Sequence, residues 1–283
     1  MAYSLDSSTD TNISGTSIHA QVTAAAGAHT LHVKAWGNSG AECDDNVAVT
    51  VTAPVAPAGP SIPSNAIRVT DIQALSGWEI NHDPATPGSS SGTSFLVASP
   101  SHGGRPRQFN TAFSGSGGEI YHVTFASDPN AMNFQYDTWV YLTASASSMG
   151  NLEMDMNQVI ANGDTVIYGF QCDGYSGTWD YTENAGSPTN PVDRWLHSNA
   201  SCNVRNWTQN VWHHIQVTYS RDNSGDVTYH SVWLDGNESK LNVTVPSAFS
   251  LGWASVLLTN LQIDGIDTGS NTTYLDQLTI ARW

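Results

Sequence analysis

The sequence predicts an all-β protein whose long C-terminal part folds as a two-sheet jelly-roll sandwich. From about residue 65 onward, short alternating or apolar segments follow one another, and turn-forming residues separate nearly all of them. No stretch shows sustained helical periodicity. Many strands without helices, over about 220 residues, favour two packed sheets.

Composition narrows the range of partners. The chain has 9 basic against 25 acidic residues, a net charge of −16, and only 12% charged residues. Nucleic acids and anionic membranes require clustered Lys and Arg, so neither is expected as a partner. No apolar run is long enough for membrane insertion. Ten Trp, ten Tyr and 24 Gly suit a secreted, extracellular protein with an aromatic-rich binding surface; no signal peptide is visible at Met1, and we expect that a natural leader has been removed.

Three parts follow along the chain: residues 1–52, a Pro/Ala linker over 53–64 (APVAPAGPSIPS), and the body over 65–283. In the first part, Leu31, Val33 and Ala35 alternate with polar residues, and Val47 and Val49 repeat the alternation, which predicts a hairpin of two strands. The stretch GAHTLHVKAW resembles the final hairpin of bacterial immunoglobulin-like domains. Residues 1–52 make up about half the usual length of such a domain. The resemblance therefore implies a partial immunoglobulin-like segment that acts as a spacer.

The body contains nine strand candidates in order. They are AIRVTDI (66–72), EIYHVTFA (119–126), NFQYDTWVYL (133–142), NLEMDMNQVI (151–160), TVIYGFQC (165–172), HHIQVTYS (213–220), YHSVWLDG (229–236), VLLTNLQI (256–263) and TYLDQLTIARW (273–283). Each combines β-branched or aromatic residues with flanking turn signals.

Three cysteines occur, and two of them flank a Gly-, Asn- and Pro-rich stretch between strand-like segments. We expect Cys172 and Cys202 to form a disulfide, which closes a loop of about thirty residues. Cys43 is then unpaired. No Cys/His cluster with zinc spacing is present.

Residues 210–236, NVWHHIQVTYSRDNSGDVTYHSVWLDG, resemble the hallmark hairpin of laminin-G-like and other concanavalin A-like domains. The end of the chain, YLDQLTIARW, resembles the closing strand of that superfamily, and FQYDTWVYL resembles another of its strands. The resemblance covers most of residues 65–283 and implies a concanavalin A-like jelly roll. Because the superfamily contains lectins, adhesion domains, hydrolases and lyases, the fold alone does not assign a function.

The stretch NLEMDMNQ (151–158) carries the clearest chemical signal. Glu153 and Asp155 are two apart and point to one face of a strand, while the apolar residues between them point to the other. The stretch is similar to the E-x-D-x-E and E-x-D-x-x-E motifs of glycoside hydrolase families 16 and 7. That resemblance implies Glu153 as nucleophile and Asp155 as its helper.

The third motif position is an amide in this chain. It is Asn157 or, if a β-bulge intervenes, Gln158. An amide can hold a sugar hydroxyl, but it cannot protonate a leaving oxygen. A hydrolase would therefore need an acid from elsewhere; the candidates are Asp173, Asp180, Glu183, Asp193 and His197.

The segment between the two cysteines (172–202) is predicted to be a long functional loop. Its aromatic residues are candidates for stacking on sugar rings, together with Trp139; they are Tyr175, Trp179, Tyr181 and Trp195. The alternative, that Trp179 and Trp195 pack the loop onto the sheet, stays open. The superfamily resemblance also implies a structural calcium ion, with Asp276 as its ligand.

These observations favour a domain that binds a polysaccharide or oligosaccharide, through Glu153, Asp155, Gln158 and the aromatic residues. One alternative is a retaining endo-glycoside hydrolase of the β-glucanase type, and another is a structural or adhesion domain. A polysaccharide lyase is less favoured, because the adjacent Tyr121 and His122 point to opposite faces of a strand. Arg105 and Arg107 would be its cationic groups.

Overall fold

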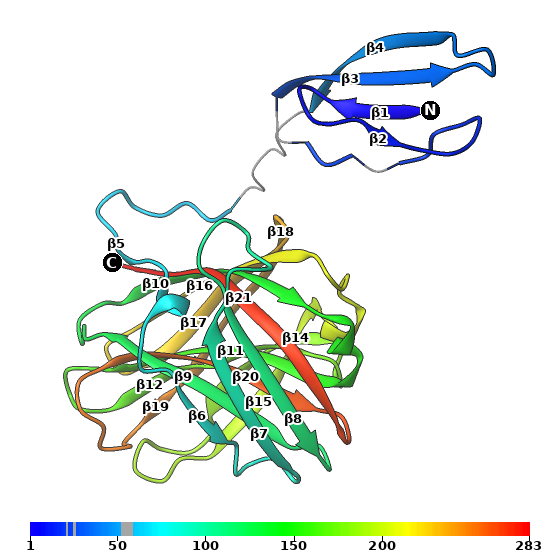
Figure 1. Cartoon of the computed structure of the whole chain (residues 1–283). Coiled ribbons are helices and arrows are strands. Elements are labelled where there is room, and N and C mark those ends of the chain that lie inside the picture. Colours follow the sequence, from blue (N-terminus) through cyan, green and yellow to red (C-terminus); the bar gives the residue numbers. More distant parts are fainter. Residues whose placement is uncertain (21, 25–26, 52–58) are drawn as a thin grey trace. The chain divides into compact units, whose positions relative to one another are not determined.

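A computed structural model describes residues 1–20, 22–24, 27–51 and 59–283. The chain divides into two compact units, Met1–Ala56 and Pro57–Trp283 (Figure 1). Half of the predicted linker over 53–64 lies outside the described residues. No helix in the described ranges is long and apolar enough to cross a membrane.

The first unit is a four-stranded antiparallel sheet with the order β2-β1-β3-β4. Its strands are β1 (Ala2–Leu5), β2 (Thr11–Asn12), β3 (Gly27–Trp36) and β4 (Glu42–Val51). The predicted hairpin is confirmed as β3–β4, in which Leu31 pairs with Val47. The strands β1 and β2 were not predicted, because their short polar segments carry little alternation. The immunoglobulin-like resemblance stays a prediction.

The second unit is a two-sheet β-sandwich, as predicted (Figure 1). One sheet has eight strands in the order β18-β17-β16-β10-β21-β8-β7, and β5 pairs with β21. These strands are β5 (Ile67–Val69), β7 (Ser89–Leu96), β8 (Arg107–Ser114), β10 (Asn133–Leu142), β16 (Trp212–Arg221), β17 (Asp226–Leu234), β18 (Asn237–Pro246) and β21 (Gly269–Arg282).

The other sheet has nine strands and carries the NLEMDMNQ stretch. Its order is β15-β14-β13-β11-β20-β9-β6; in addition, β12 pairs with β11, and β19 pairs with β12. These strands are β6 (Glu79–His82), β9 (Gly118–Ala126), β11 (Met149–Val159), β12 (Thr165–Tyr168), β13 (Phe170–Asp173), β14 (Thr178–Asn184), β15 (Asp193–Ser201), β19 (Ala248–Phe249) and β20 (Leu257–Gly265). Three short 3₁₀ helices, η1 (Ile72–Ala74), η2 (Ala144–Ser148) and η3 (Val204–Asn206), connect strands.

The core lies between the two sheets. On β11 the side chains of Leu152, Met154 and Met156 are buried in it, as the alternation predicts. Aromatic rings from both sheets meet there: Tyr168 of β12 stacks on Tyr219 of β16, with ring centroids 4.8 Å apart. The opposite face of β11 therefore carries Glu153, Asp155 and Asn157 away from the core.

The region between the cysteines is a sheet extension, so the prediction of a long loop is wrong. It contains the antiparallel pairs β13–β14 and β14–β15. The predicted disulfide is present, with Cα atoms of Cys172 and Cys202 5.3 Å apart. It joins β13 to the chain just after β15, across the intervening β14. Cys43 is exposed and not in a disulfide.

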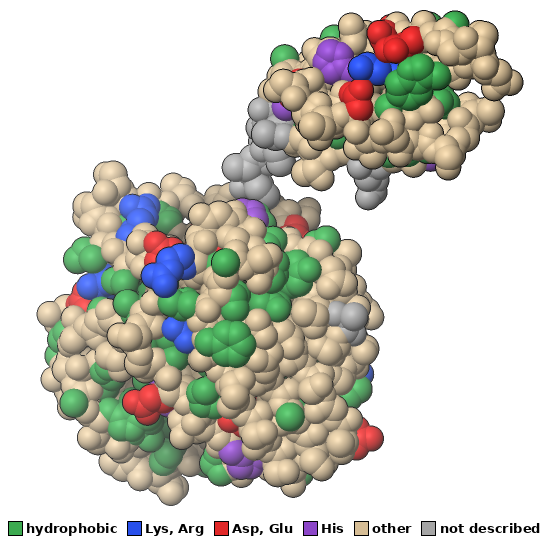
Figure 2. Space-filling view, in the orientation of Figure 1, with side chains coloured by type: hydrophobic (Ala, Val, Ile, Leu, Met, Phe, Trp, Pro, Cys, Tyr) green, Lys and Arg blue, Asp and Glu red, His purple; other side chains and the backbone are tan. Residues whose placement is uncertain are grey.

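Charged side chains are sparse on the surface. On the face of the body seen in Figure 2, acidic and basic side chains are isolated among uncharged polar groups and backbone, as expected from 12% charged residues. A concentration of carboxyl groups at one place on this molecule is therefore informative.

Candidate functional site

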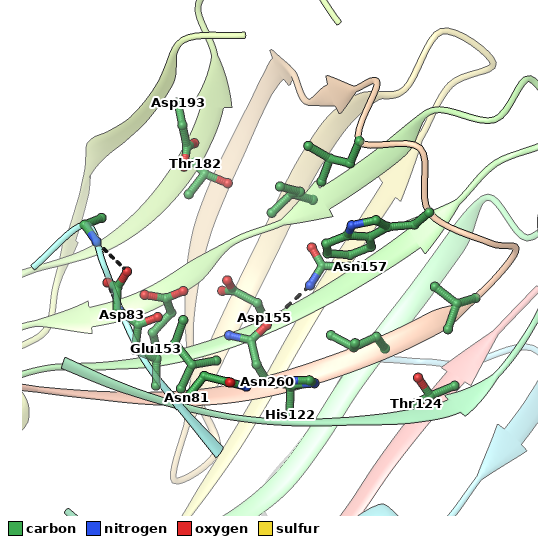
Figure 3. Close-up of a pocket in the computed structure, with 18 of the residues that line it drawn as sticks. Asn81, Asp83, His122, Thr124, Glu153, Asp155, Asn157, Thr182, Asp193 and Asn260 are labelled. Atoms are coloured by element: carbon green, nitrogen blue, oxygen red, sulfur yellow. Dashed lines mark hydrogen bonds between the residues drawn. The ribbon is translucent and has the colours of Figure 1, made fainter. Parts of the chain in front are cut away.

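A cleft of about 720 Å³ lies on the nine-stranded sheet, on the face that points away from the core. Its floor is formed by side chains from β9, β11 and β20, and its sides by residues near β6, on β14 and β15, and in the segment 251–256. Figure 3 shows Glu153, Asp155 and Asn157 projecting from one strand toward the same side. Strand alternation places them there.

The antiparallel register assembles a polar floor from distant parts of the sequence. Asp155 pairs with Asn260 of β20, which in turn pairs with His122 of β9. Two residues before Asp155 on β11, Glu153 pairs with Gln262 of β20. Directly paired residues on adjacent strands lie within contact of each other, so carboxyl and amide groups alternate across the floor.

Hydrogen bonds hold the amides of the floor in place. Asn157 Nδ2 donates to Asn260 Oδ1 at 3.3 Å. Gln262 Nε2 donates to the carboxylate of Asp83, which follows β6, at 2.9 Å. Asp83 also accepts from the backbone N–H of Ala85 at 2.9 Å (Figure 3). The edge of the cleft formed by Asp83 is thus fixed to its floor.

Glu153 and Asp155 are a buried carboxyl pair at the bottom of the cleft. Burial raises the pKa of Glu153 well above its usual range, and the neighbouring negative charge of Asp155 adds to the rise. Burial also raises the pKa of Asp155 to about 6, although hydrogen bonds from Glu153 and the Phe170 N–H oppose that rise. The Phe170 N–H donates to Asp155 Oδ1 at 2.8 Å, so Asp155 also anchors the start of β13. Ionisation of one carboxyl group of the pair therefore opposes ionisation of the other.

Apolar and aromatic side chains form the walls. Trp195 comes from β15, and Trp253 and Leu251 come from the segment between β19 and β20. Trp253 is 44% exposed although it is a large apolar residue. Gly252 beside it has a φ of 73°, a backbone conformation that favours glycine and turns the segment at this point. The cleft thus combines a polar floor with exposed indole rings.

Gln158 is not a cleft residue, and this part of the site prediction is wrong. No register shift occurs between Glu153 and Gln158 on β11, so Gln158 points to the core side. Its Oε1 accepts from Tyr168 Oη and from Arg221 Nε, each at 2.8 Å. Its Nε2 donates to the carbonyls of Asp128 and Ala131. The amide is a fully hydrogen-bonded structural group.

Of the five aromatic candidates for sugar stacking, only Trp195 lines the cleft. Trp179 is 1% exposed and stacks on Phe170 at 5.0 Å, and Tyr181 is buried against Tyr229. Strand alternation on β14 turns these two rings into the core, whereas a loop would have left them free. Tyr175 is exposed but lies outside the cleft lining, and its hydroxyl donates to the Gly265 carbonyl.

Trp139 lies on the other sheet, on β10. It is stacked between two imidazole rings, with centroids 3.5 Å from His102 and 4.3 Å from His214. Both faces of its indole are therefore covered, and it does not join Glu153 and Asp155.

Asp276 does not have the surroundings of a calcium ligand. Its carboxylate accepts from the backbone N–H groups of His102, Gly104 and Gln277, at 2.8 to 3.2 Å. Such donors repel a cation, while calcium needs several oxygen ligands. Among the described residues, one other group could hold a metal ion: ligand atoms of Asp173, Asp180 and His197 lie within 4.8 Å of one another.

The residues predicted as candidates for the missing catalytic acid lie in different places. Asp193 lines the cleft. Asp173, Asp180 and His197 lie together beside it, where His197 Nδ1 is 2.9 Å from Asp180 Oδ2. Glu183 follows the cleft-lining Thr182 and so points to the opposite face of β14.

The residues named for the polysaccharide lyase alternative do not lie together in one site. His122 lines the cleft, but Tyr121 is buried in the core. Arg107 is buried too and donates to the carbonyls of Gln73 and Leu75, while Arg105 is exposed outside the cleft lining.

Several cleft residues were missed from the sequence, namely Asn81, Asp83, Trp253, Asn260 and Gln262. A signal was present in the strand NLQIDG (260–265), where polar residues alternate with Leu261 and Ile263 much as they do in NLEMDMNQ. Trp253 stands in the turn-like stretch SLGWAS, which carries no strand or helix pattern.

No protein-family model matches the chain, and no curated protein matches its sequence. Solved structures similar to it include a carbohydrate-binding module of the β-sandwich superfamily, at 11% identity and a TM-score of 0.36 over 98% of this chain and 82% of that one. A cellulose-induced protein is 16% identical, with a TM-score of 0.42 over 72% of this chain and 90% of that one. Peanut lectin is 12% identical, with a TM-score of 0.39 over 78% and 98%. At these identities the similarity concerns the β-sandwich fold alone.

Proposed function

We propose that the body binds a polysaccharide or oligosaccharide in the cleft of the nine-stranded sheet. The observation that carries this proposal is the combination of a carboxyl and amide floor with the exposed Trp253 and Trp195. Indole rings stack on the apolar faces of sugar rings, while carboxylates and amides hydrogen-bond the hydroxyl groups. The volume of the cleft is within the range of small-molecule sites, so it accommodates a few sugar units.

Calorimetric titration with oligosaccharides of glucose, xylose, galactose, glucosamine and uronic acids tests the proposal. Trp253→Ala should weaken binding about tenfold, because stacking of one ring contributes about 1 kcal/mol or more. Trp36→Ala is a matched control, since Trp36 of the first unit is 45% exposed and lies outside the cleft. If no glycan binds, the structural or adhesion alternative is favoured. If both variants bind a glycan like the parent protein, the glycan does not stack on Trp253.

Glycan hydrolysis is the second candidate, and the buried Glu153–Asp155 pair favours it. Retaining hydrolysis requires a nucleophile and an acid about 5–5.5 Å apart, and the amide of Asn157 cannot be that acid. Asp83 and Asp193 are the remaining cleft carboxyls that could protonate a leaving oxygen. Product release by the parent protein that is lost in both Glu153→Gln and Asp83→Asn or Asp193→Asn would support an enzyme. Binding without product would exclude it.

Secretion remains part of the proposal. A disulfide between Cys172 and Cys202 persists in oxidising compartments, and polysaccharides are met outside the cell. Detection of the protein in the culture medium of its source cells would test this.

A further inference from the structure

The cleft carries an excess of acidic side chains that no Lys or Arg balances. Four of the described residues that line it have carboxyl groups (Asp83, Glu153, Asp155 and Asp193), and none is Lys or Arg. Asp264 adds a fifth carboxyl group beside the floor, and burial raises its pKa to about 6. Elsewhere in the chain, the half-buried carboxylate of Asp128 has a cationic partner in Arg282, at 2.8 Å.

Glu153 is the centre of this excess. Its residue is 7% exposed, and it points into the cleft. Beside its side chain lies the Asp155 carboxyl group, whose negative charge adds to the effect of burial in raising the pKa of Glu153. A buried carboxyl group without a basic partner costs free energy when it ionises. A ligand that brings its own cation removes this cost.

We infer that the cleft selects a polysaccharide of 2-amino-2-deoxy sugars whose amino groups are free rather than acetylated. This inference rests on the proposed carbohydrate binding and names the sugar class. The ammonium group of one unit would lie against the carboxyl groups of Glu153 and Asp155, while neighbouring rings stack on Trp253 or Trp195. An ammonium group provides three donors, which can be shared between the Glu153 carboxyl group and the Asp155 oxygen that does not accept from the Phe170 N–H.

The same charges discriminate against other glycans. A uronic acid or sulfated unit would place an anion against several buried carboxyl groups, which is strongly unfavourable. A neutral hydroxyl group can donate to Glu153 but leaves the charge of the pair uncompensated. Acetylation removes the cation and adds bulk at the same position.

The inferred binding depends on pH in two ways. The groups that face Glu153 are Asp155 on its own strand, Asp264 on β20 and Asp83 after β6. The other titratable groups around the cleft are His122 on β9, Asp173 on β13, Asp180 on β14, and Asp193 and His197 on β15. Binding weakens in acid because the carboxyl groups become protonated, and it weakens in base because the sugar amine loses its proton. A maximum near about pH 6 is expected.

Calorimetric titration of the full chain with glucosamine, N-acetylglucosamine, glucose and galacturonate hexamers tests the inference. At about pH 6 and low salt, the glucosamine hexamer should bind at least about tenfold more tightly than the acetylated or neutral hexamers. The uronate hexamer should not bind. Added salt should weaken binding of the glucosamine hexamer and leave that of the glucose hexamer nearly unchanged.

Variants test whether Glu153 and Asp155 cause the preference for the glucosamine hexamer. Glu153→Gln, and more completely Glu153→Gln with Asp155→Asn, should abolish the advantage of the glucosamine hexamer over the acetylated and neutral hexamers. Glu238→Gln on β18 is the matched control, because it makes the same chemical change outside the cleft lining. Thermal unfolding of each variant confirms that it is folded.

The outcomes separate the inference from the proposed function. Equal affinity of the parent protein for acetylated and free amino hexamers, or an affinity for the glucosamine hexamer independent of salt and pH, overturns the inference alone. Failure of all hexamers to bind overturns both. The comparison on the parent protein suffices even if a variant does not fold.

Discussion

Position on β11 decides whether a polar side chain belongs to the cleft or to the core. Asn157 and Gln158 are adjacent amides, but Asn157 lines the cleft while Gln158 is fully buried among hydrogen-bonding partners. Gln158→Ala should reduce the free energy of unfolding by about 2–4 kcal/mol, because it removes the acceptor of Arg221 and Tyr168 inside the core.

Urea unfolding measures this loss, and Asn157→Ala is the neighbouring control. Its amide has a single side-chain hydrogen bond, to Asn260, so a loss below about 1 kcal/mol is expected. Equal losses for the two variants would contradict the structural role of Gln158. The folded fraction of Gln158→Ala should keep its glycan affinity.

Whereas the buried Gln158 stabilises the fold, the buried Glu153 destabilises it when its carboxyl group is ionised. An acid whose pKa is higher in the folded state keeps its proton at pH values where the unfolded chain releases it, so stability falls as pH rises. For Glu153 and Asp155 the fall begins above the ordinary carboxyl pKa of about 4 and passes through the raised values, which for Asp155 is about 6.

Glu153→Gln should therefore stabilise the ligand-free protein. The gain should increase between about pH 5 and pH 8 and reach on the order of 2 kcal/mol. Melting temperatures of the variant and of the parent protein across this range measure the effect. A gain that is constant with pH, or that shrinks as pH rises, would show that Glu153 does not titrate as a buried acid.

At the scale of elements, the disulfide holds the edge of the nine-stranded sheet in place. Both cysteines are buried, and their bond spans β14, next to the strand that presents Trp195 and Asp193 to the cleft. Replacement of Cys172 and Cys202 by Ala should lower stability by about 2–4 kcal/mol, the usual effect for a loop of this length.

Calorimetry of this double variant, with and without a thiol reductant, measures the loss. The parent protein should lose stability under reduction while the double variant does not change. Binding should weaken as well, since β15 supplies one wall of the cleft. An unchanged melting temperature would mean that the hairpin β14–β15 is held by its sheet partners alone.

The elements that the sequence predicted are those whose apolar alternation is strong. The segment 133–142 is strand β10 with the same bounds, and NLEMDMNQVI is β11 to within two residues. The edge strand β7, SSSGTSFL, was missed because its polar residues form a strand only through pairing with β8. The hairpin β14–β15 was missed because Gly, Asn and Pro nearby indicated a loop.

The site was predictable only where one strand carried the whole signal. Glu153 and Asp155 share a strand, so their common face followed from alternation. Asn260 and Gln262 reach the same floor through pairing across about a hundred residues of chain, and no local pattern reveals that register. The prediction of Trp179 and Tyr181 as ligand contacts failed for the same reason, since their orientation depends on pairing within β13–β15.

At the scale of the whole molecule, the two units differ in how much they bury. We propose that they are separate domains, joined by the predicted linker. The body has a continuous core between two sheets, while among the described residues of the first unit only Ala2 and Ser4 are buried. A single four-stranded sheet with so little buried surface is marginally stable by itself.

Calorimetry of the full chain should therefore show the first unit unfolding at a lower temperature than the body, or without a cooperative transition. A chain of residues 59–283 retains β5, which pairs with β21, and every cleft residue. It should melt within about 2 °C of the main transition of the full chain and bind the same glycan with the same affinity, because the core and the cleft are built from residues of the body. A large loss of stability or affinity on removal of residues 1–58 would mean that the first unit supports the body directly and is not merely a spacer.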